Sequence, residues 1–291
     1  MLIRSFAKVN LALAVLGRRA DGFHEIRTVF QSIDLHDELE IRPSKRLELR
    51  CPELTSIPME ENTVWRAAAA LAHSTSPGSG AEITLKKRIP AGAGLGGGSS
   101  NAAAALLGLC RFWRLSVPAE EIQAIAASIG SDVPYFLRGG TALGIGRGEE
   151  IYPLPEIRAT NMVVVYPGLH IATGAAYQSL SLMLTSRQAP PNIQGFCGRL
   201  ADETEGLAGI FNDFETSILA AYPAVKEAKD FLKEMGATAT LLSGSGSSVF
   251  GFFLNEESAL AASRSGNARQ AWRVFPAKTL SRAEYFQSMF G

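Results

Sequence analysis

The residue types best suited to chemistry lie together in residues 90–101, which read Pro-Ala-Gly-Ala-Gly-Leu-Gly-Gly-Gly-Ser-Ser-Asn. Five of the seven residues from Gly92 to Gly98 are glycines. Glycine has no Cβ atom, so its backbone can wrap closely around an anion. Ser99 and Ser100 follow, and we expect them to cap a helix and present their hydroxyls to a phosphate or its metal ion. The pattern predicts a phosphate-binding loop.

The segments on either side are the elements that would position this loop. Residues 81–89 form a short run with β-branched side chains and predict a strand. Residues 102–109 are rich in alanine and leucine and predict a buried helix. The N-terminus of a helix has unpaired N–H groups and a partial positive charge, both of which favour a phosphate. Glycines alone leave one alternative open, a flexible loop with an ordinary serine cap.

Two better-known phosphate loops do not match this stretch. The Walker A pattern requires a lysine after its last glycine, and no lysine follows Gly98. Residues 92–97 do match G-x-G-x-x-G, but that dinucleotide-binding fingerprint also expects an acidic residue about 20 positions later, at the end of a second strand. Glu120 and Glu121 lie near that distance, yet they follow Pro118 and open a helical stretch. A dinucleotide-binding sheet is therefore disfavoured.

The composition is that of a globular protein without a dominant charge. In 291 residues, 28 Lys and Arg balance 28 Asp and Glu, which gives no general attraction to nucleic acid or membranes. The three cysteines lack a C-x-x-C pattern, which favours a reducing compartment, and the four histidines lack metal-ligand spacing. Residues 1–8 are charged too early for a signal peptide, and no apolar run reaches the roughly 20 residues of a membrane span. We expect a cytoplasmic protein that binds neither nucleic acid nor membrane.

The N-terminal part of the chain carries a second group of candidate residues. Residues 2–16 alternate loosely between apolar and polar side chains and predict a strand that contains Lys8. A lysine in such a strand normally lies on an edge or on the solvent face. A turn rich in glycine and charge follows at residues 17–26, before strands predicted at 28–35 and 38–43.

Together these stretches resemble the GHMP kinases, the family that includes galactokinase and the homoserine, mevalonate and phosphomevalonate kinases. The phosphate loop of that family is built around Pro-x-x-x-Gly-Leu-Gly-Ser-Ser, which residues 90–100 match in a longer form. The other matching motifs span almost the whole chain, and they are Ala7–Leu11, Gly17–Glu25, Val29–Gln31, Gly130–Pro134, Pro167–Thr173 and Leu241–Phe250. The turn at Gly17–Glu25 is most similar to members whose substrate carries a cytidine.

The resemblance implies an α+β fold with two domains. These are a ribosomal-protein-S5-like domain over residues 1–155 and a ferredoxin-like domain over residues 156–291. It also implies a transferase that uses ATP and Mg²⁺ to phosphorylate the 2-hydroxyl of a cytidine-diphosphate-linked methylerythritol in the non-mevalonate route to isoprenes. The glycine-rich turn in Leu241–Phe250 is expected to pack against the phosphate loop. We expect a monomer or a weak homodimer.

By the same resemblance Lys8 and Asp132 are the catalytic residues. A carboxylate within reach of the acceptor hydroxyl can take its proton or orient it, and the sequence leaves both roles open. A nearby ammonium favours the ionised carboxylate and can neutralise charge on the γ-phosphoryl oxygens. Ser100 and Asp132 are the expected contacts of Mg²⁺, and no dedicated metal cluster is expected.

The other implied site residues form two groups. Those expected at the nucleotide are Asn62, as the N-cap of a helix over residues 62–73, and Pro90, Ala91, Gly92, Ala93, Gly94, Leu95, Gly96, Gly97, Gly98, Ser99 and Ser100. Those expected at the substrate are Asn10, Phe23, His24, Phe30 and Tyr177. Aromatic faces stack on a base and an imidazole can bond its edge, which fits a cytidine pocket. Phe23 stands where members of the family usually have tyrosine.

Two other functions stay open. One is a kinase of another small alcohol such as homoserine, against which the turn at residues 21–25 argues. The other is a catalytically silent relative that binds its ligand as a sensor, against which the intact phosphate loop, Lys8 and Asp132 argue. Farther along the chain we predict a mobile surface segment over residues 186–206. Residues 256–291 predict a helix, a strand and a polar tail.

Overall fold

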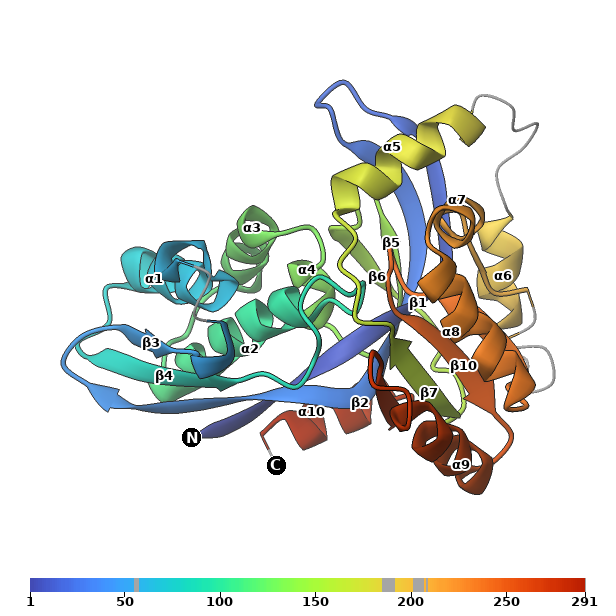
Figure 1. The fold of residues 1–291 in the computed structure, drawn as a ribbon. Coiled ribbons are helices and arrows are strands. Elements are labelled where there is room, and N and C mark those ends of the chain that lie inside the picture. The colour runs from blue at the N-terminus through green and yellow to red at the C-terminus, as the bar shows by residue number, and fades with distance from the viewer. Residues whose placement is uncertain (55–57, 185–191, 201–206, 208, 291) are drawn as a thin grey trace.

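The computed structural model describes residues 1–54, 58–184, 192–200, 207 and 209–290. In this part of the chain the strands form two sheets, one of seven strands and one of four. Helices α1, α2 and α3 accompany the first sheet at the left of Figure 1, whereas the second sheet lies at the right with helices α8 and α9. Within the same residues no helix is both long enough and apolar enough to cross a bilayer.

Two long antiparallel strands, β1 (Leu2–Arg18) and β2 (His24–Ser44), form the centre of the first sheet. The remaining strands of this sheet are β3 (Glu48–Arg50), β4 (Gly80–Lys86), β5 (Thr141–Ile145), β6 (Glu150–Pro153) and β8 (Phe211–Asn212). The prediction of separate strands at 28–35 and 38–43 is wrong, because both belong to β2. A shift of register between Phe6 and Ala7 absorbs the interruption, so the chain bulges there instead of turning.

Helices α2 (Gly97–Phe112), α4 (Val133–Phe136) and α10 (Arg282–Met289) pack on this sheet. Helices α1 (Thr63–Thr75) and α3 (Ala119–Ile129) pack on α2 as a further layer, and two short 3₁₀ turns cover Pro52–Leu54 and Met59–Glu61. The small side chains of Ala102 to Ala105 are fully buried, which lets α2 approach its neighbours closely. The predicted cap of α1 is confirmed, since the Asn62 side chain accepts a hydrogen bond from the Val64 N–H at 2.9 Å.

The second sheet consists of β7 (Asn161–Tyr166), β9 (Ala239–Leu242), β10 (Val249–Phe253) and β11 (Arg273–Lys278), and all of its pairings are antiparallel. The predicted buried strand at residues 161–166 is confirmed as β7. Helices α8 (Pro223–Glu234) and α9 (Glu256–Asn267) pack on this sheet, and α7 (Glu215–Ala221) packs against α8 and against α5 (Thr173–Leu184). Helix α6 (Ile193–Arg199) instead contacts β1 and β2 of the first sheet.

The two sheets share one apolar core. Ala7, Val9 and Leu11 of β1 cluster with Val164 of β7 and Phe250 of β10. Side chains alternate between the two faces of a strand, so the residues between them in β1 point to the opposite face of the sheet. That face is where the candidate site lies.

Two predictions for the C-terminal half need correction. The prediction of a polar tail after β11 is wrong, because residues 282–289 form α10 with a capping box between Ser281 and Glu284. Part of the segment 186–206, expected to be mobile, forms α6, while residues 186–191 and 201–206 lie outside the described residues. The division into two domains at residue 155 stays a prediction. Beyond that residue, β8 pairs with β1 and α10 packs on β1 and β2 of the N-terminal sheet.

Candidate functional site

The glycine-rich loop leads from β4 directly into α2. The helix begins at Gly97, five residues earlier than predicted, and its N-cap is Gly96 in the left-handed conformation with φ 68°. The prediction that Ser99 or Ser100 caps the helix is therefore wrong. Gly96 has no side chain with which to cap the first-turn N–H groups, so these groups remain available to an anion.

The loop is held by the second glycine-rich turn, residues 243–248. The Ser243 hydroxyl donates to the Gly94 carbonyl oxygen at 2.9 Å, and the Ser248 N–H donates to the Ala93 carbonyl oxygen at 3.2 Å. A Cβ atom on Gly94 would lie only 2.1 Å from the Ser243 carbonyl oxygen, so this approach requires glycine. The expected packing of the two glycine-rich turns is confirmed.

Ser100 does not face the loop. It is buried, its hydroxyl donates to the Phe6 carbonyl oxygen at 2.6 Å, and it accepts a hydrogen bond from the Ser5 hydroxyl at 2.7 Å. The side chain therefore fastens α2 to β1 and does not line the cavity beside the loop. Ser99 borders the cavity beside the loop and has the better position for such a contact.

Lys8 and Asp132 meet on the face of β1 that is turned away from the second sheet. Lys8 is 3% exposed, which excludes a solvent-face lysine. Its Nζ lies 3.6 Å from Oδ2 of Asp132, whose side chain is 31% exposed. Asp132 precedes α4 but makes no capping hydrogen bond to it. The carboxylate therefore faces the ammonium and does not cap its own helix.

The surroundings of Lys8 fix its position and shift its pKa. Its Nζ donates to Oδ1 of Asn10 at 2.7 Å and lies 5.5 Å from the centre of the Phe30 ring. Asn10 is itself oriented by Thr28, because its Nδ2 donates to the Thr28 hydroxyl at 2.7 Å. Burial lowers the pKa of Lys8, and the carboxylate of Asp132 opposes that change. An anion arriving beside this ammonium would further stabilise its charged form.

One cavity of about 830 Å³ joins these groups, a size typical of small-molecule sites. The predicted residues that line it are Lys8, Asn10, Phe23, His24, Phe30, Pro90, Gly92, Ala93, Gly94, Gly96, Gly97, Gly98, Ser99, Asp132 and Tyr177. Four predicted residues, all within the described chain, lie outside the lining, and they are Asn62, Ala91, Leu95 and Ser100. Leu95 contributes through its backbone instead, since its carbonyl oxygen accepts the Lys8 N–H at 3.1 Å.

Aromatic side chains gather in one region of this cavity. The rings of His24 and Tyr177 stack with centroids 4.3 Å apart, and Tyr177 meets the edge of Phe214. Burial and the charge of Arg18 lower the pKa of His24, which favours the neutral imidazole. Phe30 lies apart from this group, because its ring is buried beneath Lys8 and packs against Tyr135 at 4.6 Å.

Phe23 is the most exposed of the predicted substrate residues, at 53%. The guanidinium of Arg147 lies 4.8 Å from the centre of its ring, which is a cation–π contact. Neither this contact nor the aromatic stacking involves the phenol hydroxyl that Phe23 lacks. The replacement of tyrosine therefore leaves the aromatic surface in place.

Several residues of the lining were not predicted from the sequence. Arg18 and Arg147 add positive charge, the Thr63 hydroxyl donates to the Gly98 carbonyl oxygen at 2.7 Å, and Nδ1 of His170 lies 3.1 Å from the Gly92 carbonyl oxygen. Arg18 and His170 lie inside sequence motifs that resemble those of the family, and this position could have identified them as candidate site residues. Within the described residues, no group of three or more His, Cys, Asp or Glu is arranged to hold a metal ion.

Known proteins match this chain along nearly all of its length. Residues 62–140 match the family described as GHMP kinases N terminal domain, and residues 196–270 match GHMP kinases C terminal. The 4-diphosphocytidyl-2-C-methyl-D-erythritol kinase of Syntrophus aciditrophicus (strain SB) is 39% identical over 279 residues, covering 96% of this chain and 99% of that protein. The kinase of the same name from Solibacter usitatus (strain Ellin6076) is 43% identical over 257 residues, covering 86% of this chain and 80% of its own.

A solved structure agrees with these sequence relatives. The crystal structure of a 4-(cytidine 5'-diphospho)-2C-methyl-D-erythritol kinase superposes with a TM-score of 0.81 at 32% identity, covering 96% of this chain and 99% of the other. Fold, phosphate loop and full-length relatives therefore lead to one assignment. The chain belongs to the GHMP kinase family, and within it to the 4-diphosphocytidyl-2-C-methyl-D-erythritol kinases.

Proposed function

We propose that this protein transfers the γ-phosphoryl group of ATP to the 2-hydroxyl of 4-diphosphocytidyl-2-C-methyl-D-erythritol, which yields the 2-phosphate and ADP. The observation that carries the proposal is the position of the Lys8–Asp132 pair. It faces the same cavity as the phosphate loop and the aromatic group of His24 and Tyr177. A phosphate-binding loop, a proton acceptor and a base-binding surface are the parts of a protein that this reaction needs.

Different residues of the chain have different roles in the reaction. The first-turn N–H groups of α2 hold the ATP phosphates, and the Lys8 ammonium neutralises charge that develops on the γ-phosphoryl oxygens. The Asp132 carboxylate accepts a hydrogen bond from the acceptor hydroxyl and takes its proton as the bond to phosphorus forms. The rings at residues 23, 24 and 177 hold the cytidine and thereby position the hydroxyl for attack.

The same cavity fits a Mg²⁺ ion that arrives with ATP. Mg²⁺ prefers one or two carboxylates together with substrate phosphates and waters, so a dedicated protein cluster is not required. Asp132 and Ser99 are the cavity-lining residues that would hold it, directly or through water. When bound, the ion neutralises charge on the β- and γ-phosphates.

The test is ADP release with ATP and Mg²⁺, measured separately with the cytidyl substrate, homoserine and mevalonate. We expect turnover with the cytidyl substrate alone, and a loss of about 10²–10⁴-fold in Asp132→Asn, the range for loss of a general base. Glu257→Gln, an exposed carboxylate change on α9, is the matched control and should behave as wild type. Turnover of another alcohol would overturn the cytidine assignment. ATP binding without turnover on any substrate would favour the sensor function.

Two further proposals follow from the sequence. We propose that the protein acts in the cytoplasm, and that it is a monomer or a weak homodimer. Light scattering over a range of protein concentrations tests the second proposal, and a mass of two chains that persists on dilution would contradict it.

A further inference from the structure

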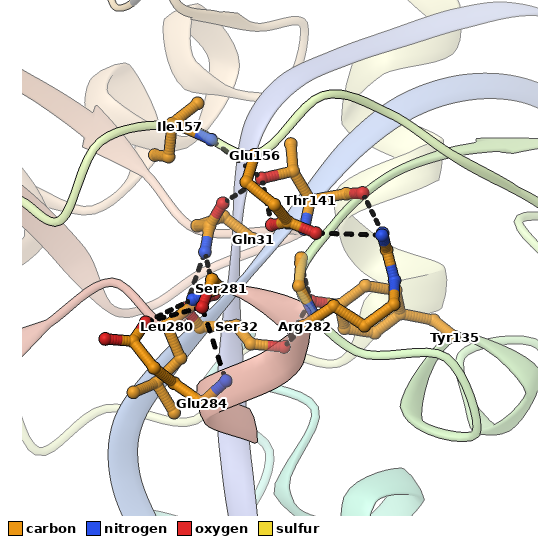
Figure 2. Close-up of polar contacts among 11 residues, drawn as sticks. Gln31, Ser32, Tyr135, Thr141, Glu156, Ile157, Leu280, Ser281, Arg282 and Glu284 are labelled. Atoms are coloured by element: carbon orange, nitrogen blue, oxygen red, sulfur yellow. Dashed lines mark hydrogen bonds and ion pairs between the residues drawn. The ribbon is translucent and has the colours of Figure 1, made fainter. Parts of the chain in front are cut away.

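A polar network outside the cavity joins the C-terminal helix to the segment that carries Asp132 (Figure 2). Its members come from β2, α4, β5 and α10 and from the segments at residues 156–157 and 280–281. In the described part of the chain, none of the residues labelled in Figure 2 lines the cavity. Substrate binding therefore does not account for this network.

Tyr285 of α10 makes the most direct connection. It is fully buried, and its hydroxyl donates to the carbonyl oxygen of Phe136, the last residue of α4, at 2.8 Å. Its ring covers the turn after α4, since a Cβ atom on Gly139 would lie 2.4 Å from it. Asp132 stands at the other end of the same short helix.

Phe136 also connects α4 to the phosphate loop. A Cβ atom on Gly96 would lie 2.7 Å from the Phe136 ring, so the ring rests directly on the residue that precedes α2. The helix that carries Asp132 therefore lies between the phosphate loop and Tyr285. A displacement of α4 would change the separation of Asp132 from the bound phosphates.

Arg282 holds the turn that follows α4. Its guanidinium lies 2.9 Å from Oε1 of Glu156 and donates to the Thr141 carbonyl oxygen at 2.8 Å (Figure 2). Glu156 in turn accepts the Thr141 N–H at 3.0 Å. A Cβ atom on Gly140 would lie 2.8 Å from the Arg282 nitrogen, so α10 reaches the backbone of the turn itself.

The network also supports Lys8. The Tyr135 hydroxyl of α4 lies 2.7 Å from the Ser32 hydroxyl and donates to the Gly140 carbonyl oxygen at 2.8 Å. The Tyr135 ring packs against Phe30, the ring that lies beneath the Lys8 ammonium. Phe30, which lies beneath Lys8, and α4, which follows Asp132, are thus both in contact with Tyr135 or Tyr285.

We propose that Tyr285 is a positioning residue for phosphoryl transfer, acting through α4 to hold Asp132 at its working distance from Lys8 and the acceptor hydroxyl. The inference rests on the role of Asp132 in the proposed function. A helix as short as α4 has little stability of its own, so its orientation is set by what packs on it. Displacements of about 1 Å can cost roughly 10²-fold in rate.

The test replaces Tyr285 by Phe, which removes one hydroxyl and keeps the ring. We expect kcat to fall about tenfold, because the loss of one hydrogen bond should displace α4 by less than the roughly 1 Å that costs about 10²-fold in rate. KM for ATP should stay within about twofold. Met289→Ala is the matched control, because it deletes a buried side chain of the same helix that makes no polar contact with α4. It should lower the melting temperature and leave kcat near wild type. An equal loss of kcat in both variants would overturn the proposal.

A double-mutant cycle separates this inference from the proposed function. If Tyr285 acts through Asp132, then Tyr285→Phe should lower the residual rate of Asp132→Asn no further. A second tenfold loss in the double variant would overturn the positioning role. An active Asp132→Asn would instead overturn the proposed base. An inactive Asp132→Asn together with a fully active Tyr285→Phe would overturn the positioning role alone.

Discussion

The close approach of the two glycine-rich turns gives a sharp prediction for Gly94→Ala. The added Cβ atom would lie 2.1 Å from the Ser243 carbonyl oxygen, where real contacts need about 3.0 Å, so one turn must move by about 0.9 Å. Gly94 also has φ 77°, a conformation that costs alanine about 1–2 kcal/mol. Overpacking adds about 1–3 kcal/mol. We expect the free energy of unfolding to fall by about 2–5 kcal/mol.

Two measurements check this magnitude. Urea unfolding gives the loss of stability, and titration with ATP and Mg²⁺ gives the Kd, which should rise about 30-fold if about 2 kcal/mol of the strain is relieved by opening the loop. Gly98→Ala is the control for the unfolding experiment. Its Cβ atom would meet only Thr63 at 3.5 Å, an ordinary contact, and alanine in a helix is more stable than glycine by about 0.5–1 kcal/mol. Unfolding of Gly94→Ala with the wild-type free energy would refute this reasoning.

Three further predictions concern charge and substrate binding. Asp37→Asn should lower the free energy of unfolding by about 3–5 kcal/mol in urea, because it leaves the buried ammonium of Lys87 without its partner. Burial holds the pKa of Lys8 below the ordinary 10.5, so the unfolded chain binds this proton more tightly. The contribution of Lys8 to stability should therefore grow as pH rises from its folded pKa toward 10.5, measured as the difference between wild type and Lys8→Met. Tyr177→Ala should raise KM for the cytidyl substrate about 5- to 150-fold, equivalent to the roughly 1–3 kcal/mol of a base–aromatic stacking contact, and leave KM for ATP unchanged.

Each of these has an outcome that would contradict it. Asp37→Asn with wild-type stability would mean that Lys87 finds another partner or loses its proton at no cost. A difference between wild type and Lys8→Met that stays constant with pH would mean an unperturbed lysine. Equal changes in both KM values for Tyr177→Ala would mean that the ring supports the whole cavity instead of the base.

Features set by nearby residues were predictable from the sequence. Asn62 caps α1 because its side chain reaches an N–H group two residues later, and β7 is buried because its residues are almost all apolar. The phosphate loop was predictable for the same reason, since its five glycines lie within seven consecutive residues. Its helix boundary was missed because the left-handed Gly96, instead of a serine side chain, ends the loop. Serine caps are the commoner solution.

Features set by distant contacts were not predictable in this way. The bulge that joins the two predicted strands into β2 depends on its pairing with β1. The burial of Tyr285 and its hydrogen bond to Phe136 connect residues 149 positions apart. A polar stretch at the end of the chain gives no local sign that one tyrosine in it will be buried. Motif resemblance located Lys8 and Asp132, but their separation required the fold.

The hydrogen bonds from Ser243 and Ser248 to the phosphate loop make the nucleotide site part of the contact between the two sheets. A ligand that binds only the closed arrangement stabilises the folded chain by mass action, by about 2.7 kcal/mol at 100 times its Kd. That stabilisation is lost when the part of the chain around either sheet unfolds, because each part supplies one side of the contact. Bound nucleotide should therefore couple the unfolding of the two sheets and sharpen their melting into a single transition.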